Sequence, residues 1–390
     1  MPRLLILNEE QGHGGVHTVS TVLQAQLQAR GWTVETQAVR GQRLSPGSLW
    51  RAARQADVLL ASNNFRPAYV AVLLGRLSRR PSVVWVHGPL REVLAQAARQ
   101  STPAGSLTKP LHPALQKLRH LLLRKQLQLA DARVCVSETS RQSLLAWLGP
   151  GAAETRLVRN PAPACLTLAD VPSAAAPDSL PLPALQDTPA PSQPEPDPPN
   201  RPPRAGTPPP VRIGCVTRLS PEKRPGLALQ ALRLLPAHHH LTLLGDGPLQ
   251  DSLSAEGRDL LHNGRLQMPG AQTVTLQTYA DWDLSLLCAA YEGYPMAALE
   301  SLAAGVACVG PPLPALQEML GPQAAKWLAE DDSPAALARA VERCLQTPVA
   351  QRRQQAQAIA RQHDVDSFGA RWDRLLRSLI RPACPGGRAP

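Results

Sequence analysis

Aromatic residues are scarce in this 390-residue chain, at 3% of its composition, and long apolar runs are missing. Few aromatics leave little material for stacking nucleic-acid bases, and the sequence contains neither a zinc-finger pattern nor an RNP sequence. No stretch approaches the roughly 20 consecutive apolar residues that a membrane-spanning helix needs. We therefore expect no nucleic-acid partner and no transmembrane segment.

Cysteine pairs at metal-ligand or redox spacing are missing as well. The seven cysteines are odd in number and widely scattered, which is typical of reduced thiols in a reducing compartment. The N-terminus, MPRLLILNEE, holds a short apolar run before Asn8, too short for the apolar region of a signal peptide. The expected location is the cytoplasm, with a peripheral position at the inner membrane face left open.

Acidic residues are outnumbered, with 30 against 41 basic ones, so the formal net charge is +11. Such a balance favours anionic partners, including nucleotides and acidic lipid surfaces. One basic stretch, LRHLLLRKQLQLAD at 118–131, fits a helix on a membrane surface, or a packing helix whose basic face meets water. We favour the packing helix and leave a peripheral membrane contact open.

Proline, by contrast, is abundant and unevenly placed. Residues 161–210 hold 17 of the 41 prolines, and such a segment forms neither a helix nor a central strand. We expect an extended or disordered linker there, between an N-terminal domain at 1–160 and a second domain at 211–363. Residues 364–390 have apolar side chains at helical spacing, which predicts an amphipathic helix and tail crossing back to the first domain.

Short apolar strands alternate with helical stretches in both blocks. Expected strands include RLLILN and SVVWVHG in the first block, and VRIGCV and LTLLGDG in the second. This alternation predicts an α/β protein whose parallel sheets are covered on both faces. Two such blocks indicate two Rossmann-like domains facing a cleft, with ligands bound beyond the carboxyl ends of the strands.

The stretch YEGYPMAALESLAAG, at 291–305, holds two isolated acids, Glu292 and Glu300, in an otherwise small and apolar run. Pro295 suits the start of a helix, and Gly305 suits its end. The free N–H groups at the helix start form a natural seat for a diphosphate. A carboxylate on either side suits the hydroxyl groups of an attached sugar and ribose.

These residues carry a resemblance. The pattern E-G-Y-P-x-x-x-x-E-S-x-A-x-G resembles the EX7E signature of retaining family-4 glycosyltransferases (glycosyltransferase group 1) with the GT-B fold. VTRLSPEKRPGLALQAL is similar to that family's GRLxxxKG segment, and LTLLGDGPLQDSL to its GxGP turn. QGHGGVHTVSTVL resembles its glycine-rich loop after the first strand. The resemblance covers nearly the whole chain outside the linker.

The resemblance implies a GT-B fold with a C-terminal helix on one domain. It also implies retaining, metal-independent transfer from a nucleotide-diphosphate sugar to a glycan or lipid-linked glycan, typical of cell-surface polysaccharide biosynthesis. Glu292 would contact the transferred sugar, and Glu300 would hold the ribose hydroxyls. The remaining donor-binding residues would meet the diphosphate: Arg218, Lys223, Gly293, Tyr294 and Pro295.

In the first block, the resemblance implies that Gly14 and Gly15 approach the phosphates or the acceptor. It also implies that His87, at a strand end, acts beside Glu292 near the reacting carbon. Asn160 matches the family's turn at the end of the N-terminal domain, but Pro-Ala-Pro follows it in place of the usual residues. A role for Asn160 is therefore not assigned.

Other readings of these features stay open. The aspartates of DWD, at 281–283, match a metal-binding pattern, although they are better explained as residues preceding a strand. The histidines at 238–240 point in different directions and are expected on a surface turn. A nucleotide-sugar epimerase, a phosphorylase or a non-catalytic sugar-nucleotide-binding scaffold remains an alternative to the transferase.

Overall fold

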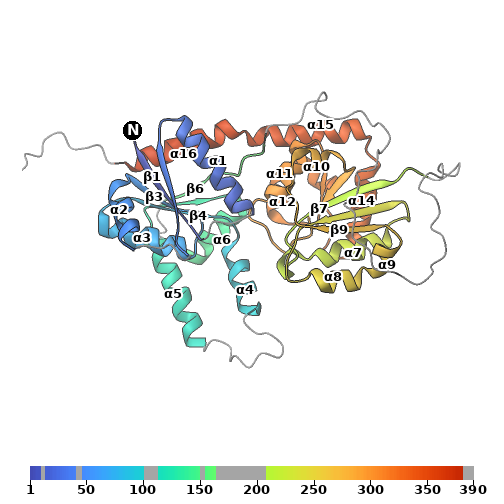
Figure 1. The fold of residues 1–390 in the computed structure, drawn as a ribbon, viewed down its shortest axis with the longest axis horizontal. Helices are drawn as coiled ribbons and strands as arrows, with labels where there is room; N and C mark the ends of the chain where they lie inside the picture. The colour runs from blue at the N-terminus through green and yellow to red at the C-terminus, as the bar shows by residue number, and fades with distance from the viewer. Residues whose placement is uncertain (10–13, 41–45, 101–112, 150–153, 164–207, 381–390) are drawn as a thin grey trace, which may run out of the picture.

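A computed structural model describes residues 1–9, 14–40, 46–100, 113–149, 154–163 and 208–380, which form two α/β domains (Figure 1). The first domain has a parallel sheet in the order β2-β1-β3-β4-β5-β6. Its strands are β1 (Arg3–Asn8), β2 (Thr33–Ala38), β3 (Val58–Ala61), β4 (Ser82–Val86), β5 (Ala132–Cys135) and β6 (Thr155–Leu157). Its helices are α1 (Gly15–Ala29), α2 (Pro46–Gln55), α3 (Arg66–Ser78), α4 (Leu90–Gln100), α5 (Pro113–Leu129) and α6 (Glu138–Leu148).

The second domain has a parallel sheet in the order β11-β10-β7-β8-β9. Its strands are β7 (Val211–Val216), β8 (His239–Leu244), β9 (Leu266–Gly270), β10 (Leu284–Leu286) and β11 (Cys308–Val309). Its helices are α7 (Pro225–Leu234), α8 (Gln250–Glu256), α9 (Arg258–His262), α10 (Leu276–Ala280), α11 (Met296–Ala303), α12 (Pro314–Leu320), α13 (Ala324–Trp327), α14 (Pro334–Leu345) and α15 (Val349–Ala360). Short 3₁₀ turns occur at Pro221–Lys223, Gly321–Gln323 and Arg361–His363.

This architecture confirms the predicted fold of two parallel-sheet domains. The expected strands are present, and the structure adds β6 and β9, which the sequence analysis did not predict. Both lie at the edge of their sheet, where one side lacks a partner strand and the sequence pattern is weaker. The predicted linker falls largely at 164–207, outside the described residues, as does the tail at 381–390.

The central strands are apolar throughout because helices cover both sheet faces. In β1, Leu4 and Ile6 belong to the same core as α1, while Leu5 and Leu7 belong to the core under α2 and α3. Successive strand residues point to opposite faces, so one strand serves both cores. The carboxyl ends of the strands are thereby fixed at one edge of each sheet.

The last helix, α16 (Val365–Leu379), crosses back and packs on α1 of the first domain (Figure 1). Its buried face includes Phe368 and Trp372, and Trp372 meets the Trp85 ring edge-on at a centroid distance of 4.8 Å. The Trp32 indole N–H donates to Asp373 Oδ1 at 2.6 Å. This packing confirms the predicted amphipathic helix on one of the two domains.

The expected turn holds for His238 but is wrong for the next two histidines. His239 and His240 begin β8, and the His239 side chain is only 2% exposed, with Nε2 3.0 Å from Glu342 Oε1. Burial lowers the pKa of His239. Strand alternation explains the error, because it sends His239 inward and leaves His240 half-buried, with Nδ1 3.1 Å from the Gly264 carbonyl oxygen.

Candidate functional site

The loop after β7 is held in place by a glycine turn after β8. Gly245 has φ +141°, and a Cβ there would lie 1.9 Å from the Thr217 carbonyl oxygen. Gly247 is similarly tight against Leu219, whose N–H donates to the Asp246 carbonyl at 2.7 Å. Only glycine allows this backbone-to-backbone contact, and the contact fixes the loop that carries Arg218 and Lys223.

A second set of bonds joins that loop to the segment after β10. The Lys223 ammonium lies 2.5 Å from Glu292 Oε1, with both side chains largely buried. The Ala290 N–H donates to the Glu222 carbonyl at 2.8 Å, and the Arg224 guanidinium donates to the Cys288 and Ala289 carbonyls. Because β7 and β10 are neighbours at the point where strand order reverses, these two loops open the crevice where doubly wound domains bind ligands.

Arg218 lies at the outer edge of this group. Its side chain is 64% exposed and forms an ion pair with Glu222. Burial raises the pKa of Glu222, but the Ser220 hydroxyl and the Arg218 charge outweigh it and hold that pKa below its usual range. The pairing holds an exposed guanidinium against Glu222, the residue before Lys223, without burying it.

Glu300 occupies a more enclosed position on α11. The Tyr279 hydroxyl donates to Glu300 Oε2 at 3.0 Å. Burial raises the pKa of the Glu300 carboxyl, and the bond from Tyr279 lowers it by a smaller amount. The Glu300 carboxylate thus accepts a hydrogen bond from one neighbour, Tyr279. Burial disfavours its ionised form.

The start of α11 meets the first domain directly. A Cβ on Gly293 would lie 1.7 Å from the carbonyl oxygen of His87, which follows β4. Similarly, a Cβ on Gly15, the first residue of α1, would lie 3.3 Å from the Met296 side chain. Gly14 has φ +122° and precedes α1. The N-terminal ends of α1 and α11 therefore meet at the junction of the two domains.

His87 presents a neutral ring at this junction. Burial lowers its pKa to about 3, although a hydrogen bond to the Ser62 backbone partly opposes this. Nε2 is enclosed and has no hydrogen-bond partner in the described residues. Since the other ring nitrogen is left for the Ser62 bond, Nε2 carries the lone pair.

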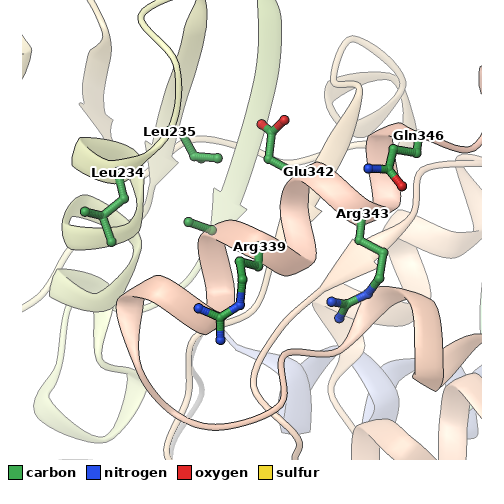
Figure 2. A pocket seen from close by; sticks show the side chains of 7 residues that line it. Leu234, Leu235, Arg339, Glu342, Arg343 and Gln346 are labelled. Atoms are coloured by element: carbon green, nitrogen blue, oxygen red, sulfur yellow. The ribbon is translucent and has the colours of Figure 1, made fainter.

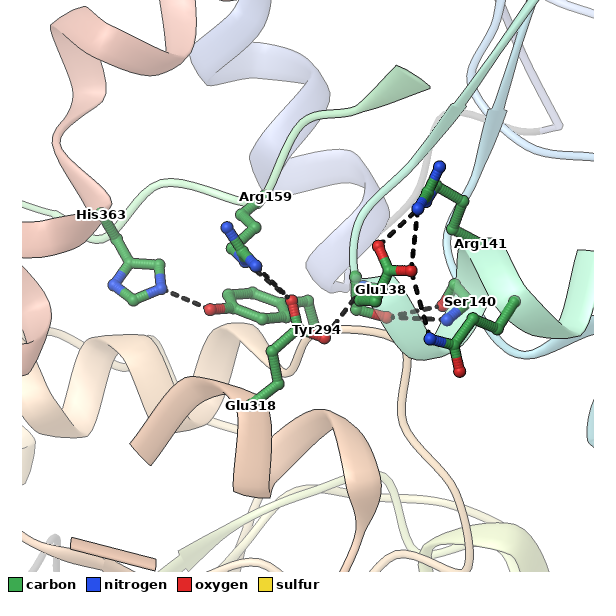
Figure 3. Close-up of polar contacts among 9 residues, drawn as sticks. Glu138, Ser140, Arg141, Arg159, Tyr294, Glu318 and His363 are labelled. Carbon is green, nitrogen blue, oxygen red and sulfur yellow. Dashed lines mark hydrogen bonds and ion pairs between the residues drawn. The ribbon is translucent and has the colours of Figure 1, made fainter. Parts of the chain in front are cut away.

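Tyr294 links the start of α11 to both connections between the domains, and Figure 3 shows its bond to His363. Asn160 Nδ2 donates to the Tyr294 carbonyl at 3.0 Å, and the Tyr294 hydroxyl bonds His363 Nε2. His363 Nδ1 lies 3.0 Å from the Ile359 carbonyl oxygen. Nδ1 must therefore carry the proton, so Nε2 accepts the hydrogen bond from the tyrosine.

An ion pair closes the same region. Arg159 lies 2.7 Å from Glu318 Oε1, and the Glu138 N–H donates to Glu318 Oε2 at 2.8 Å (Figure 3). Both oxygens of a carboxylate from the second domain are thus held by the first domain. Sequence reasoning missed this group, because its members lie far apart in the chain and no local motif joins them.

Several of the predicted site residues form one group. Glu292, Lys223, Gly293 and Pro295 lie together at the start of α11, and His87 is in contact through Gly293. Arg218 and Glu300 flank this group on either side. The sequence left Asn160 without a role, but the structure places it on Tyr294.

The DWD segment has a structural part in the fold. Asp283 Oδ2 accepts the Arg212 N–H at 2.8 Å, and a Cβ on Gly214 would overlap the Trp282 ring. Among the described residues, no three His, Cys, Asp or Glu side chains gather at a single metal position. The segment therefore anchors β10 against β7.

A hollow of about 400 Å³ lies between α7 and α14, at the far end of α7 from Lys223 (Figure 2). Arg343 and Arg339 on its rim already pair with Glu330. Ten helical residues separate this end from the start of α7, a length of about 15 Å at 1.5 Å per residue. The hollow is therefore separate from the candidate site.

Two protein families match this chain. The model described as Glycosyl transferases group 1 matches residues 202–363, and the model described as Glycosyltransferase Family 4 matches residues 38–163. The two matches fall on the second and first domains, respectively. A search of proteins with curated function finds no match.

Solved structures with the same arrangement include Anabaena HepE in complex with UDP-glucose, with TM-score 0.71 and 16% identity over 96% of this chain and 99% of that one. Sucrose-phosphate synthase from Thermosynechococcus elongatus gives TM-score 0.67 and 15% identity over 97% and 99%. The lipopolysaccharide outer core galactosyltransferase WaaB gives 0.59 and 15% over 97% and 99%. At such identities the likeness shows the fold, which is GT-B.

Proposed function

We propose that this chain, whose two domains match glycosyltransferase family models, is a retaining enzyme that moves a sugar from a UDP-sugar to a glycan or lipid-linked glycan. The Lys223–Glu292 ion pair carries this proposal. It places a cation and a carboxylate 2.5 Å apart at the junction of the domains, beside the free N–H groups that open α11. A diphosphate needs a cation, and the hydroxyl groups of the sugar attached to it need a neighbouring carboxylate.

The donor would lie along the start of α11. Its diphosphate would meet Lys223, Arg218 and the helix N-terminus, all of which carry positive charge or partial charge. Its ribose hydroxyls would donate to Glu300, whose orientation is held by Tyr279. UDP is proposed because Anabaena HepE is known in complex with UDP and with UDP-glucose.

The transferred sugar would lie between Glu292 and His87. Glu292 accepts hydrogen bonds from sugar hydroxyls, and the lone pair on His87 Nε2 accepts another from the opposite domain. Because each domain supplies one of these groups, the sugar is held in reactive geometry only when the domains are together.

The chemistry needs no further base in this arrangement. The bond between the sugar and the diphosphate breaks while the acceptor oxygen bonds to the same face of the sugar, and the leaving phosphate takes the acceptor proton. Arg218 and Lys223 stabilise the negative charge that develops on the leaving group, a task that metal ions perform in other transferases. We propose that the reaction is metal-independent for this reason.

The proposal is tested by assaying transfer from UDP-, GDP- and ADP-sugars to a panel of glycan and lipid-linked acceptors, with and without EDTA. Glu292→Gln and Lys223→Ala should each lower kcat about 100-fold, the usual effect of removing one electrostatic contact to a transition state. Lys326→Ala, on α13 of the same domain, is the matched control and should keep full activity.

NMR of the product distinguishes retention from inversion at the anomeric carbon. An inverted product would contradict the retaining mechanism and leave the transferase assignment standing. Release of sugar 1-phosphate, or an epimerised donor in the absence of acceptor, would instead favour the phosphorylase or the epimerase. Full turnover by both variants would show that the catalytic site lies elsewhere.

A further inference from the structure

Exposed large apolar side chains gather on two neighbouring helices of the first domain. Among the described residues, eleven large hydrophobic side chains are exposed, and six of them lie on α3 and α5. These six are Leu73, Leu77, Leu118, Leu121, Leu122 and Leu129. Such clustering exceeds the scattered single exposures that need no explanation.

Helix α5 has two separate apolar faces. Leu123 and Leu127 are buried in the core, so one face anchors the helix. Leu118, Leu122 and Leu129 form a different stripe, roughly 140° around the axis at 100° per residue. The first half of α5 projects from the body of the domain (Figure 1). Every side chain from Lys117 to Leu122 is exposed.

The leucines of α3 extend this surface. Arg76 Nη2 of α3 donates to the Leu129 carbonyl of α5 at 2.8 Å, which sets the two helices side by side. Leu73 and Leu77, one turn apart, are 60% and 62% exposed. We call these six leucines, with the lysines and arginine between them on α5, the basic leucine face.

The charge on this face has one sign. Neither α3 nor α5 contains an Asp or a Glu. The exposed side chains of Lys117, Arg119 and Lys125 stand among the leucines, and no ion pair joins them to another described residue. A partner for this face must therefore combine apolar material with negative charge.

We propose that the basic leucine face docks on an anionic lipid bilayer, with α5 lying in the interface. Leucines of an interfacial helix enter the boundary between headgroups and acyl chains, while lysines and arginines reach the anionic headgroups. No described helix is long and apolar enough to cross a bilayer, so the contact is peripheral. The inference does not depend on the transfer reaction.

A second copy of this chain fits the face poorly. A twofold contact would set the same uncompensated lysines and arginine opposite each other, and like charges repel. Nucleic acid would satisfy the charges and leave the leucines in water. A bilayer with anionic lipid satisfies both.

Sedimentation with vesicles of phosphatidylcholine, alone or with one third phosphatidylglycerol, tests the proposal on the full chain. The wild type should sediment with the anionic vesicles, much less with the neutral ones, and less as salt rises. Leu118→Gln/Leu121→Gln/Leu122→Gln should lower the partition coefficient about tenfold or more. Lys117→Gln/Arg119→Gln/Lys125→Gln should lower it about 100-fold, at about fivefold for each of the three charges.

The matched control is Leu234→Gln/Val349→Gln, which removes exposed apolar side chains from the second domain and should leave sedimentation unchanged. Because all substituted side chains are exposed, the melting temperature should stay constant and report intact folding. Equal sedimentation of wild type and the leucine variant, or no sedimentation of either, would overturn the proposal. So would a wild-type dimer in light scattering that the leucine variant abolishes, or binding to single-stranded DNA that the leucine variant retains while vesicles are ignored.

Discussion

Gly293 shows how one residue can govern the meeting of two domains. Its backbone is outside the left-handed region, so alanine is conformationally acceptable there. What forbids a side chain is the carbonyl of His87, 1.7 Å from the position of a Cβ. The restriction belongs to the junction and not to the fold of either domain.

Gly293→Ala is therefore expected to leave the melting temperature nearly unchanged and to lower kcat/KM about 100-fold or more, since a displacement near 1 Å at reacting groups has effects of that size. Small-angle scattering should show a larger radius of gyration as the domains separate. Gly226→Ala, on α7 with ordinary contacts only, is the control and should keep full activity. Full activity of Gly293→Ala would refute the closed junction as the active arrangement.

Glu300, which we propose holds the donor ribose, would combine a cost in stability with a role in binding. Its folded pKa is raised by burial, so the folded state binds more protons than the unfolded state in the pH range just above 4.5. The free energy of unfolding contributed by this group accordingly falls as pH rises through its folded pKa. A neutral amide avoids that loss.

Glu300→Gln should thus melt at the same or a higher temperature at pH 7.5, while the KM for the sugar nucleotide rises about tenfold or more because a charged acceptor is lost. Calorimetry and donor titration measure the two effects. Glu256→Gln on α8, an exposed helical acid, should change neither. A lower melting temperature with unchanged KM would make Glu300 a structural residue.

At the scale of elements, helix α11 is fixed at its start by contacts from outside its own sequence. Asn160 holds the Tyr294 carbonyl, and His363 accepts from its hydroxyl. These two residues lie on the two chain connections between the domains, which are joined by the Ala162 N–H donating to the His363 carbonyl at 2.8 Å. The two chain connections between the domains therefore position the loop that carries Glu292.

Tyr294→Phe should lower the free energy of unfolding by about 1 kcal/mol or somewhat more, because it leaves His363 Nε2 without its hydrogen-bond donor. A fall in kcat/KM with donor KM little changed is expected, since the hydroxyl acts through loop position. Tyr69→Phe is the control, because Tyr69 is a half-buried tyrosine on α3. If wild type and Tyr294→Phe differ in the free energy of unfolding but have identical kinetics, the hydroxyl of Tyr294 only stabilises the fold.

At the scale of the whole molecule, buried neutral histidines set a pH dependence. Burial lowers the pKa of both His87 and His363; Arg159 and Arg371 lower that of His363 further, whereas Glu318 raises it. Folded protein then binds fewer protons than unfolded protein below pH 6.5. Stability is present above that pH and is lost as pH falls toward the folded values.

The free energy of unfolding should decline between pH 7 and pH 5, with each histidine contributing up to about 1.4 kcal/mol per pH unit. His363→Gln keeps an acceptor for Tyr294 and removes one titration, so its decline should be shallower. Chemical denaturation at several pH values measures this. An identical slope for wild type and variant would contradict the assignment.

Much of the fold followed from the sequence alone. Continuous apolar strands such as RLLILN can only be buried on both faces, and their alternation with helices requires parallel sheets. The resemblance to family-4 glycosyltransferases implied one donor site for Glu292, Lys223 and the start of α11, and the fold brings them together because each follows one of two neighbouring strands. The sequence did not predict β6, β9 or the burial of His239. Pairing at the sheet edges determines the two strands, and contacts across the sheet determine the direction of the histidine.

The sequence by itself determined the two-domain architecture, the strand–loop–helix corner at 291–305 and the amphipathic last helix, because hydrophobic periodicity and turn residues act locally. Only the tertiary structure decided that Gly293 abuts His87, that Tyr294 joins both connections and that exposed leucines lie on the neighbouring helices α3 and α5. These contacts join residues far apart in the chain, and long-range packing, which no local pattern encodes, brings them together.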